Sequence, residues 1–172
     1  AKPDVIVNAT AYTAVDKAES EPERAMRLNT EAPCVIGRWA AAHDALVIHY
    51  STDYVFDGCK DTPYVETDTP HPVSVYGRSK LAGDEGLLAS GCAAIILRVS
   101  WVYGMRGSNF LLTMRRLMQE RDTLSIVDDQ FGAPTWCRTI AQVTAALLAK
   151  MPETNDARQS LRGVYHLAPG GS

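Results

Sequence analysis

The chain has 172 residues, 46% hydrophobic and 22% charged, which is long enough to bury the core of one globular domain. Its 17 basic and 20 acidic residues give a net charge of −3 without any run of Lys and Arg, which argues against a nucleic-acid partner. No apolar run approaches the ~20 residues of a membrane span, and the N-terminus lacks the layout of a secretory signal. We therefore expect a cytoplasmic protein that binds neither membranes nor nucleic acids.

The four cysteines and four histidines form no pattern that indicates a metal site or a redox pair. No two cysteines have CxxC spacing, and no histidines stand at the spacing of metal ligands. Free thiols in a reducing compartment are the expectation, and no metal site is predicted.

Strands and helices are predicted to alternate along the chain. An apolar run at 4–10 predicts a strand, and the polar stretch 13–29 predicts two short helices separated by Pro22. The elements expected after these are a helix at 29–44, a strand at 45–52, a long loop at 57–73, a helix at 74–90, a strand running into a loop at 93–104, a helix at 108–122, a strand at 124–129, a helix at 138–150, a polar loop at 152–162 and a strand at 163–168. Three nearly all-apolar strands with helices between them indicate an α/β fold with a parallel sheet covered on both faces.

Polar or aromatic side chains stand at the ends of three predicted strands. They are Asn8, Thr10 and Tyr12 in the first group, Ser51, Thr52 and Asp53 in the second, and Ser100, Trp101 and Tyr103 in the third. Ligands of open α/β sheets bind beyond the carboxyl ends of the strands, and such a cleft would suit a polar small molecule such as a sugar. The alternative is that these Ser, Thr and Asp residues only form turns and helix caps, but three such ends together favour a site.

The segment YGRSK places Tyr76 and Lys80 four residues apart on a predicted helix, and hence on one face. A free tyrosine has a pKa near 10, and a neighbouring ammonium group lowers that pKa. The pair therefore predicts a general acid that gives a proton to a carbonyl oxygen while hydride arrives at its carbon.

Together with the hydroxyl-bearing strand end and the Pro-rich loop upstream, this segment resembles the extended short-chain dehydrogenase/reductases, and within them the dTDP-4-dehydrorhamnose reductase family. The resemblance covers residues 3–168 and is carried by segments 3–29, 49–58, 75–84, 98–104, 109–114 and 128–135. It implies a Rossmann-like, doubly wound parallel sheet. It also implies NADPH-dependent, less often NADH-dependent, reduction of the C4 ketone of dTDP-4-dehydro-L-rhamnose to dTDP-L-rhamnose, a step of nucleotide-sugar and cell-wall polysaccharide synthesis.

The resemblance also implies roles for individual residues. Tyr76 would protonate the C4 oxygen, Thr52 would orient the carbonyl, and Lys80 would lower the Tyr76 pKa and hold the nicotinamide ribose. The implied cofactor-binding residues are Asn8, Ala9, Thr10, Ala11, Tyr12 and Ser51, together with Tyr76 and Lys80. The implied substrate-binding residues are Thr13, Val15, Asp53 and Trp101, with the loop 131–135 near the nucleotide. Tyr54 stands where related dehydratases carry a glutamate, which leaves ketone reduction as the predicted reaction.

Two departures from the family pattern change the expectation for this chain. Arg138 stands where some members carry a glutamate of a Mg²⁺-linked dimer, so neither Mg²⁺ nor that dimer is expected, and a homodimer of another kind stays open. The glycine-rich strand, turn and helix that open the family's sequences do not occur here. We therefore interpret the chain as truncated and expect weak or no NADPH binding by the chain alone. Residues 1–104 would be the C-terminal part of the NAD(P)-binding Rossmann domain without its first βαβ unit, and residues 105–172 mainly the substrate-binding region interleaved with it.

Two alternatives stay open. The first is a non-catalytic regulatory or binding subunit on the same fold, since the regulatory subunit of methionine adenosyltransferase resembles this family. The second is a related nucleotide 4-keto-sugar reductase that uses another base or gives the other stereochemistry at C4. An intact set of Thr52, Tyr76 and Lys80 favours an enzyme over the regulatory subunit.

Overall fold

A computed structural model describes residues 2–170, which divide into two compact units. Unit 1 runs to Arg98 and resumes at Pro152–His166, whereas unit 2 comprises Val99–Met151 and the residues from Leu167 onward. The predicted assignment of cofactor and substrate roles to 1–104 and 105–172 stays a prediction.

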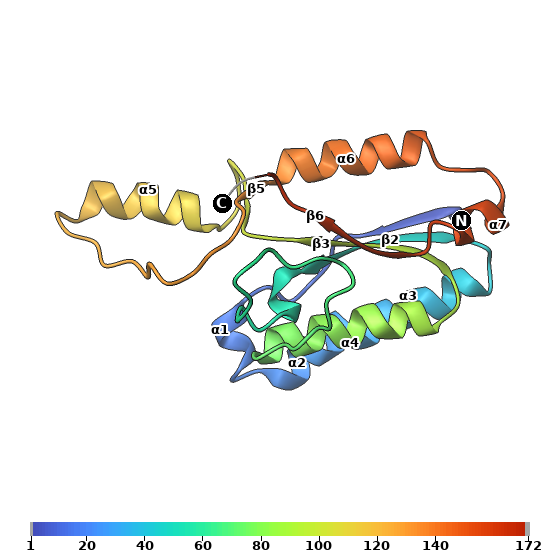
Figure 1. Cartoon of the computed structure of the whole chain (residues 1–172), viewed down its shortest axis with the longest axis horizontal. Helices are drawn as coiled ribbons and strands as arrows, with labels where there is room; N and C mark the ends of the chain where they lie inside the picture. The colour runs from blue at the N-terminus through green and yellow to red at the C-terminus, as the bar shows by residue number, and fades with distance from the viewer. Residues whose placement is uncertain (1, 171–172) are drawn as a thin grey trace. The chain divides into compact units, whose positions relative to one another are not determined.

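A four-stranded sheet in the order β1-β2-β3-β6 forms the centre of unit 1 (Figure 1). Its strands are β1 (Val5–Asn8), β2 (Leu46–Thr52), β3 (Ala93–Val99) and β6 (Gly163–Leu167). The strands β1 and β2 run parallel, with Val5 opposite Leu46 and Asn8 opposite His49. All four strands were predicted, three of them from nearly all-apolar runs, and the α/β fold with a parallel sheet is confirmed.

Five α-helices belong to unit 1: α1 (Val15–Ala18), α2 (Pro22–Met26), α3 (Ala32–Ala41), α4 (Val75–Ala89) and α7 (Asn155–Gln159). Pro22 separates the first two as predicted, because it is the first residue of α2, where a missing N–H leaves no bond unmade. A π-helical turn at Arg27–Glu31 joins α2 to α3, so the helix expected at 29–44 begins inside a continuous helical segment. The loop expected at 152–162 contains α7, whose N-terminus is capped by Thr154.

The helix α4 forms despite three glycines because those glycines allow close packing. Its N-terminus is capped by Ser74, whose hydroxyl accepts a hydrogen bond from the Gly77 N–H at 3.0 Å. A Cβ atom at Gly77 would collide with the Tyr54 carbonyl oxygen, and one at Gly83 with the Asn29 carbonyl oxygen. The glycines thus bring α4 against both the turn that follows β2 and the π-helical turn.

The main apolar core of unit 1 lies between the sheet and the neighbouring helices α3 and α4 (Figure 1). It contains Ala40, Ala45, Val47, Leu87, Cys92, Ala94 and Ile96, with Ile36, Trp39, Leu88 and Val164 packed around it. Each fully buried Val, Leu or Ile side chain contributes about 1.5–3 kcal/mol, so this layer fixes α4 against β2.

Unit 2 contains the two-residue strands β4 (Val102–Tyr103) and β5 (Thr135–Trp136), which pair in parallel, and the helices α5 (Phe110–Glu120) and α6 (Cys137–Ala149). Both helices were predicted. The strand predicted at 124–129 is wrong, because these residues pair with no strand in the described part of the chain and Val127 is 67% exposed. A β-prone run without a partner strand does not form a sheet. Within residues 2–170, no helix combines the length and the apolarity that crossing a membrane requires.

Candidate active site

The end of β2 places the hydroxyl of Thr52 at the start of a turn. Thr52 is the N-cap of the 3₁₀ turn Asp53–Val55, because its Oγ1 accepts a hydrogen bond from the Tyr54 N–H at 3.2 Å. The same hydroxyl donates to Oδ1 of Asp53 at 3.1 Å. The turn-forming interpretation of these residues is therefore correct locally, and it leaves Thr52 buried at the carboxyl edge of the sheet.

Tyr76 lies in the first turn of α4 and is 8% exposed. It packs against Tyr12, Ala18 and Ala25, and the Tyr54 ring meets it edge-on with 5.5 Å between the ring centres. Burial raises the pKa of Tyr76 to about 12, and a side-chain hydrogen bond with Thr52 acts in the opposite direction.

This pKa corrects one prediction. Lys80 was expected to lower the Tyr76 pKa, but burial dominates, and Lys80 is not among the groups that shift it. The structure brings Thr52 within hydrogen-bonding reach of Tyr76, while the catalytic roles of both residues stay predictions. A pKa above 10 keeps Tyr76 protonated at neutral pH, which a proton donor requires.

Lys80 lies one turn further along α4 and is 1% exposed. Its ammonium donates to the Tyr50 carbonyl oxygen at 2.6 Å, and Nε2 of His49 lies 3.3 Å from Nζ. Burial lowers the pKa of Lys80 to about 8, while the carboxylate of Asp84 acts to raise it. Since an ammonium carries three hydrogens, it keeps donor capacity for a further acceptor.

A buried polar cluster continues from Lys80 into unit 1. It comprises Asn8 from β1, His49 and Ser51 from β2, Asp84 from α4 and Arg98 from β3. Ser51 Oγ donates to Oδ2 of Asp84 at 2.6 Å, and the amide nitrogen of Asn8 lies 2.9 Å from Nδ1 of His49. Burial raises the pKa of Asp84 to about 6 and lowers the pKa of His49 to about 3, so His49 is neutral at physiological pH.

The predicted cofactor-binding residues lie along the segment that follows β1. Thr10 donates from both its N–H and its hydroxyl to Oδ1 of Asn8, at 3.2 and 2.7 Å, and Ala9 and Ala11 lie in the same extended stretch. Tyr12 is turned inward, since its hydroxyl donates to Glu21 at 3.0 Å. Its side-chain hydroxyl therefore has a partner within the chain.

The predicted substrate-binding residues fall in both units. In unit 1, Thr13 is exposed, Val15 packs against the Tyr76 cluster, and Asp53 adjoins Thr52. In unit 2, Trp101 has a positive φ of 41°, and its ring lies so close to Gly132 that a Cβ atom there would collide with it. Trp101 and the loop 131–135 thus lie together, whereas the substrate roles of all these residues stay predictions.

Sequence reasoning missed three residues of this region. Asn29, within the π-helical turn, accepts from the Tyr12 N–H at 2.8 Å and donates to the Tyr12 carbonyl and to Ser79 Oγ, so it joins the β1 segment to α4. A π-helical turn often marks a functional site. His49 was set aside as a scattered histidine, and Asp84 was not singled out. The available signal was that Asp84 continues the four-residue spacing of Tyr76 and Lys80.

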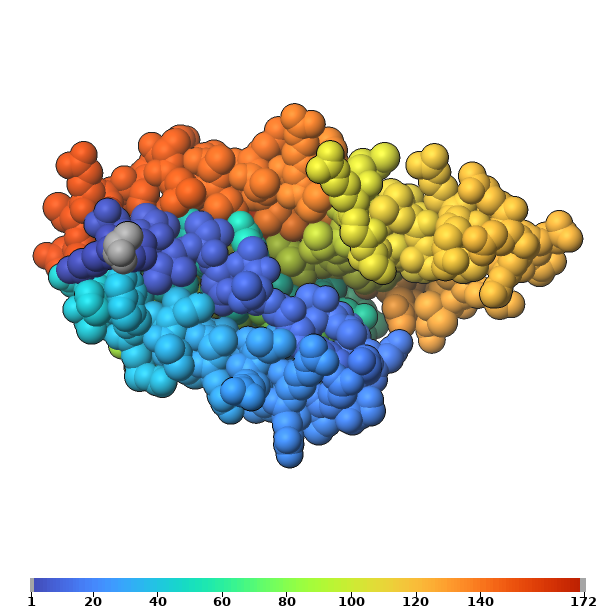
Figure 2. All heavy atoms as spheres, turned by 180° about the vertical axis from the view of Figure 1, so that it is seen from behind, coloured from blue at the N-terminus to red at the C-terminus, as the bar shows by residue number. Residues whose placement is uncertain are grey.

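An open surface hollow of about 600 Å³ lies on α2 and the π-helical turn, lined by Pro22, Glu23, Met26, Arg27 and Glu31. Figure 2 shows this part of the surface in blue. None of its lining residues is a predicted site residue, so the hollow is not taken as the active site.

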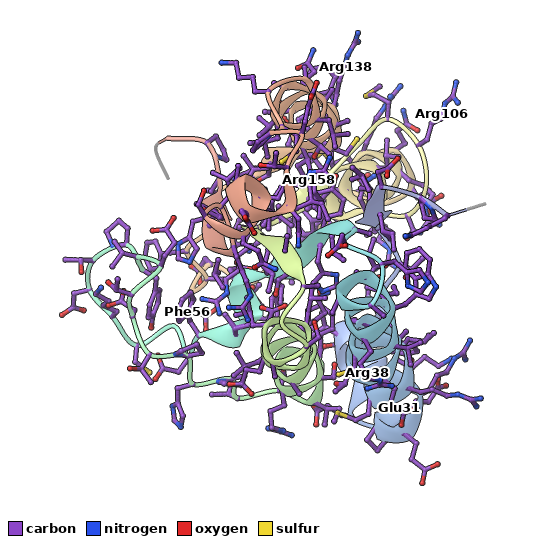
Figure 3. The ribbon with its side chains drawn as sticks, turned by 90° about the vertical axis from the view of Figure 1, so that its right-hand side faces the viewer. Glu31, Arg38, Phe56, Arg106, Arg138 and Arg158 are labelled. Carbon is purple, nitrogen blue, oxygen red and sulfur yellow. The ribbon has the colours of Figure 1, made fainter. Side chains whose placement is uncertain are left out.

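Figure 3 labels Phe56, which begins the long loop after β2 and whose ring lies 5.2 Å from the Arg98 guanidinium.

The structure combines an α/β sheet with a threonine at a strand end that is hydrogen-bonded to the tyrosine of a Tyr-x-x-x-Lys pair. This combination defines the short-chain dehydrogenase/reductase class. The family model described as the RmlD substrate binding domain matches residues 1–172, and the chain belongs to this family.

Several relatives agree with this assignment. The dTDP-4-dehydrorhamnose reductase of Burkholderia thailandensis is 50% identical over 171 residues, covering 99% of this chain and 57% of that protein. That of Salmonella typhimurium is 48% identical and is matched over 56% of its length. The crystal structure of the enzyme from Bacillus anthracis, in complex with NADP, superposes with a TM-score of 0.88 at 35% identity, over 99% of this chain and 57% of that one. The chain thus spans somewhat more than half the length of these relatives.

Proposed function

We propose that this chain is the catalytic part of an NADPH-dependent reductase of a nucleotide-linked 4-keto sugar, dTDP-4-dehydro-L-rhamnose. The observation that carries the proposal is the hydrogen-bonded pair of Thr52 and Tyr76, with Lys80 one helical turn away. The relatives that match nearly the whole chain are named for this reaction. We also propose that the sheet of unit 1 is a doubly wound, Rossmann-like sheet that lacks its first βαβ unit.

The proton of the reaction would come from Tyr76. Because the pKa of Tyr76 is about 12, its hydroxyl is protonated at neutral pH and gives the proton to the C4 oxygen as negative charge develops there. The Thr52 hydroxyl would turn its single hydrogen from Asp53 to that oxygen and so orient it. The bound cofactor supplies the hydride to C4.

The ammonium of Lys80 fits the ribose of a nicotinamide nucleotide. Its bond to the Tyr50 carbonyl fixes the position of Nζ, and its remaining hydrogens match vicinal hydroxyl acceptors. NADPH, with NADH as the less frequent choice, is therefore the proposed cofactor.

Tyr54 supports reduction rather than elimination of water. It follows Asp53, and its ring packs against Tyr76 where a second carboxylate would be needed to remove a proton from carbon. The turn after β2 thus offers one carboxylate, that of Asp53. We propose that Asp53 contacts a sugar hydroxyl.

The test joins this chain to the N-terminal segment of a relative and follows NADPH oxidation with dTDP-4-dehydrorhamnose. We expect turnover, and we expect Tyr76→Phe to reduce kcat by about 10²-fold or more, which is the usual contribution of a positioned proton donor. The matched control is Tyr165→Phe, since Tyr165 is a half-exposed tyrosine whose hydroxyl donates to the Leu161 carbonyl.

No turnover, or a Tyr76→Phe variant as active as the unmodified protein, would overturn the proposal. Binding of the sugar nucleotide without turnover would instead favour the regulatory-subunit alternative. NMR analysis of the product decides between dTDP-L-rhamnose and its C4 epimer, and therefore tests the alternative of a related 4-keto-sugar reductase.

A further inference from the structure

Asp84 is a buried carboxylate that the proposed reaction does not use. It lies one turn beyond Lys80 on α4, as Lys80 lies one turn beyond Tyr76, and all three side chains are buried. Its Oδ2 accepts from Ser51 at 2.6 Å and lies 3.7 Å from Nε of Arg98. Its Oδ1 has no hydrogen-bond partner within residues 2–170, although Nε2 of His49 lies only 3.7 Å away. A buried carboxylate oxygen without a partner is costly and calls for an explanation.

The hydrogen bonds of Asn8 fix which nitrogen of His49 carries the hydrogen. Oδ1 of Asn8 accepts from the N–H and the hydroxyl of Thr10, so the amide nitrogen of Asn8 is the atom that faces His49. An amide nitrogen can only donate, so Nδ1 of His49, at 2.9 Å, must accept. A neutral imidazole has one donor and one acceptor, and the hydrogen is therefore on Nε2.

The Nε2–H of His49 points into the space between Lys80 and Asp84. Since it is a donor, it cannot accept a hydrogen bond from the Lys80 ammonium 3.3 Å away, and the ammonium is directed to the Tyr50 carbonyl. The same N–H is placed to donate to the unpartnered Oδ1 of Asp84 after a small movement of either side chain. His49 thus separates the buried cation from the buried anion.

We propose that Asp84 and His49 are positioning residues for Lys80, with Asp84 as its buried counter-charge and His49, held in one tautomer by Asn8, as the spacer between them. This inference rests on the proposed function, in which Lys80 holds the ribose of the cofactor. The charged and titratable groups that face Asp84 are Lys80 from its own helix, His49 from β2 and Arg98 from β3, with the Ser51 hydroxyl beside them. Removing the Asp84 charge leaves Lys80 with burial as the dominant influence on its protonation.

The first test titrates Lys80 in the chain itself, without cofactor or substrate. The chain has five lysines, and with isotope-labelled lysine the Lys80 NMR signal is identified by its loss in Lys80→Met. We expect Asp84→Asn to lower the titration midpoint of Lys80 by about one pH unit or more, a tenfold loss of proton affinity. The matched control is Glu85→Gln, which removes an exposed carboxylate at the next position of the same helix and should leave the midpoint unchanged.

The second test reads the tautomer of His49 from ¹⁵N NMR spectra of the histidine-labelled chain. We expect the hydrogen on Nε2 in the unmodified chain and on Nδ1 in Asn8→Asp, because the new carboxylate accepts where the amide donated.

A Lys80 midpoint that is the same in Asp84→Asn and in Glu85→Gln would overturn the proposal, and so would a hydrogen on Nδ1 of His49 in the unmodified chain. If Asp84→Asn does not fold, the tautomer of the unmodified chain decides. Both measurements are independent of turnover, so failure of the reductase assay leaves them interpretable.

Discussion

Replacing Lys80 by methionine is predicted to remove a pH dependence from the stability of the chain. The pKa of Lys80 is lowered from 10.5 to about 8 because the ammonium is buried. The folded state therefore prefers the neutral amine. The free energy of unfolding is highest above pH 10.5, and this stabilisation is lost as the pH falls through 8. At about 1.4 kcal/mol per pKa unit, the protonated lysine destabilises the fold by on the order of 3 kcal/mol. Solvent does not screen this charge, since Lys80 is 1% exposed.

The assay is urea unfolding of the two chains at a series of pH values from 7 to 11. We expect the free energy of unfolding of the unmodified chain to rise by roughly 3 kcal/mol relative to Lys80→Met between pH 7 and 10.5. The comparison uses the slope with pH, because the variant also leaves Asp84 without its counter-charge. Lys150→Met, which alters an exposed lysine, is the control and should give a difference that is flat with pH. A flat difference for Lys80→Met as well would refute the reasoning that burial of the ammonium costs stability.

Three further predictions follow from the packing of unit 1. Gly83→Ala should lower the free energy of unfolding by about 1–3 kcal/mol, because the added Cβ would collide with the Asn29 carbonyl. In the control Gly163→Ala the added Cβ has ordinary contacts and should change this free energy little, so equal urea midpoints of the two variants would contradict the prediction. The pKa of Asp57 is lowered to about 2 by hydrogen bonds from Tyr64, Cys59 and His71, so the carboxylate stabilises the loop 57–73 above pH 4 and this stabilisation is lost as the pH falls toward 2. Asp57→Asn should therefore speed proteolysis within that loop at neutral pH, and an unchanged cleavage rate would contradict this. Within residues 2–170, β1 is an edge strand of its sheet, and an unpaired edge favours association, so we expect this chain to dimerise through β1; light scattering that shows a monomer at every concentration would contradict this.

The sequence was sufficient for those parts of the fold that depend on local pattern. Apolar runs located β2 and β3, and the four-residue spacing located α4 with Tyr76 and Lys80 on one face. The strand expected at 124–129 failed because strand formation depends on a partner that no local pattern reveals. The missed helix α7 is only five residues long, and its Thr154 cap is a weak signal within a polar stretch.

The electrostatics of the site were the least predictable part. The spacing of Tyr76 and Lys80 gives their proximity, but the shift of each pKa is set by how deeply the side chain is buried, which depends on tertiary packing. His49 and Asp84 became relevant only when the sheet brought β1, β2 and α4 together. Residues 41 positions apart in the sequence, such as Asn8 and His49, have no sequence signal that pairs them.

The path of the chain has a consequence for how unit 1 forms. The strand β6 begins only at Gly163, so residues 100–162, which include most of unit 2, lie between β3 and its neighbour in the sheet. Closing a loop of that length costs only slightly more entropy than closing a shorter one, but a contact between such distant segments forms slowly. During synthesis on a ribosome, β3 would keep an unpaired edge until residues 163–167 have emerged. The backbone N–H of His166 in β6 then donates to a carboxylate oxygen of Glu66, and its ring donates to the Tyr64 carbonyl; these two hydrogen bonds hold β6 to the loop 57–73.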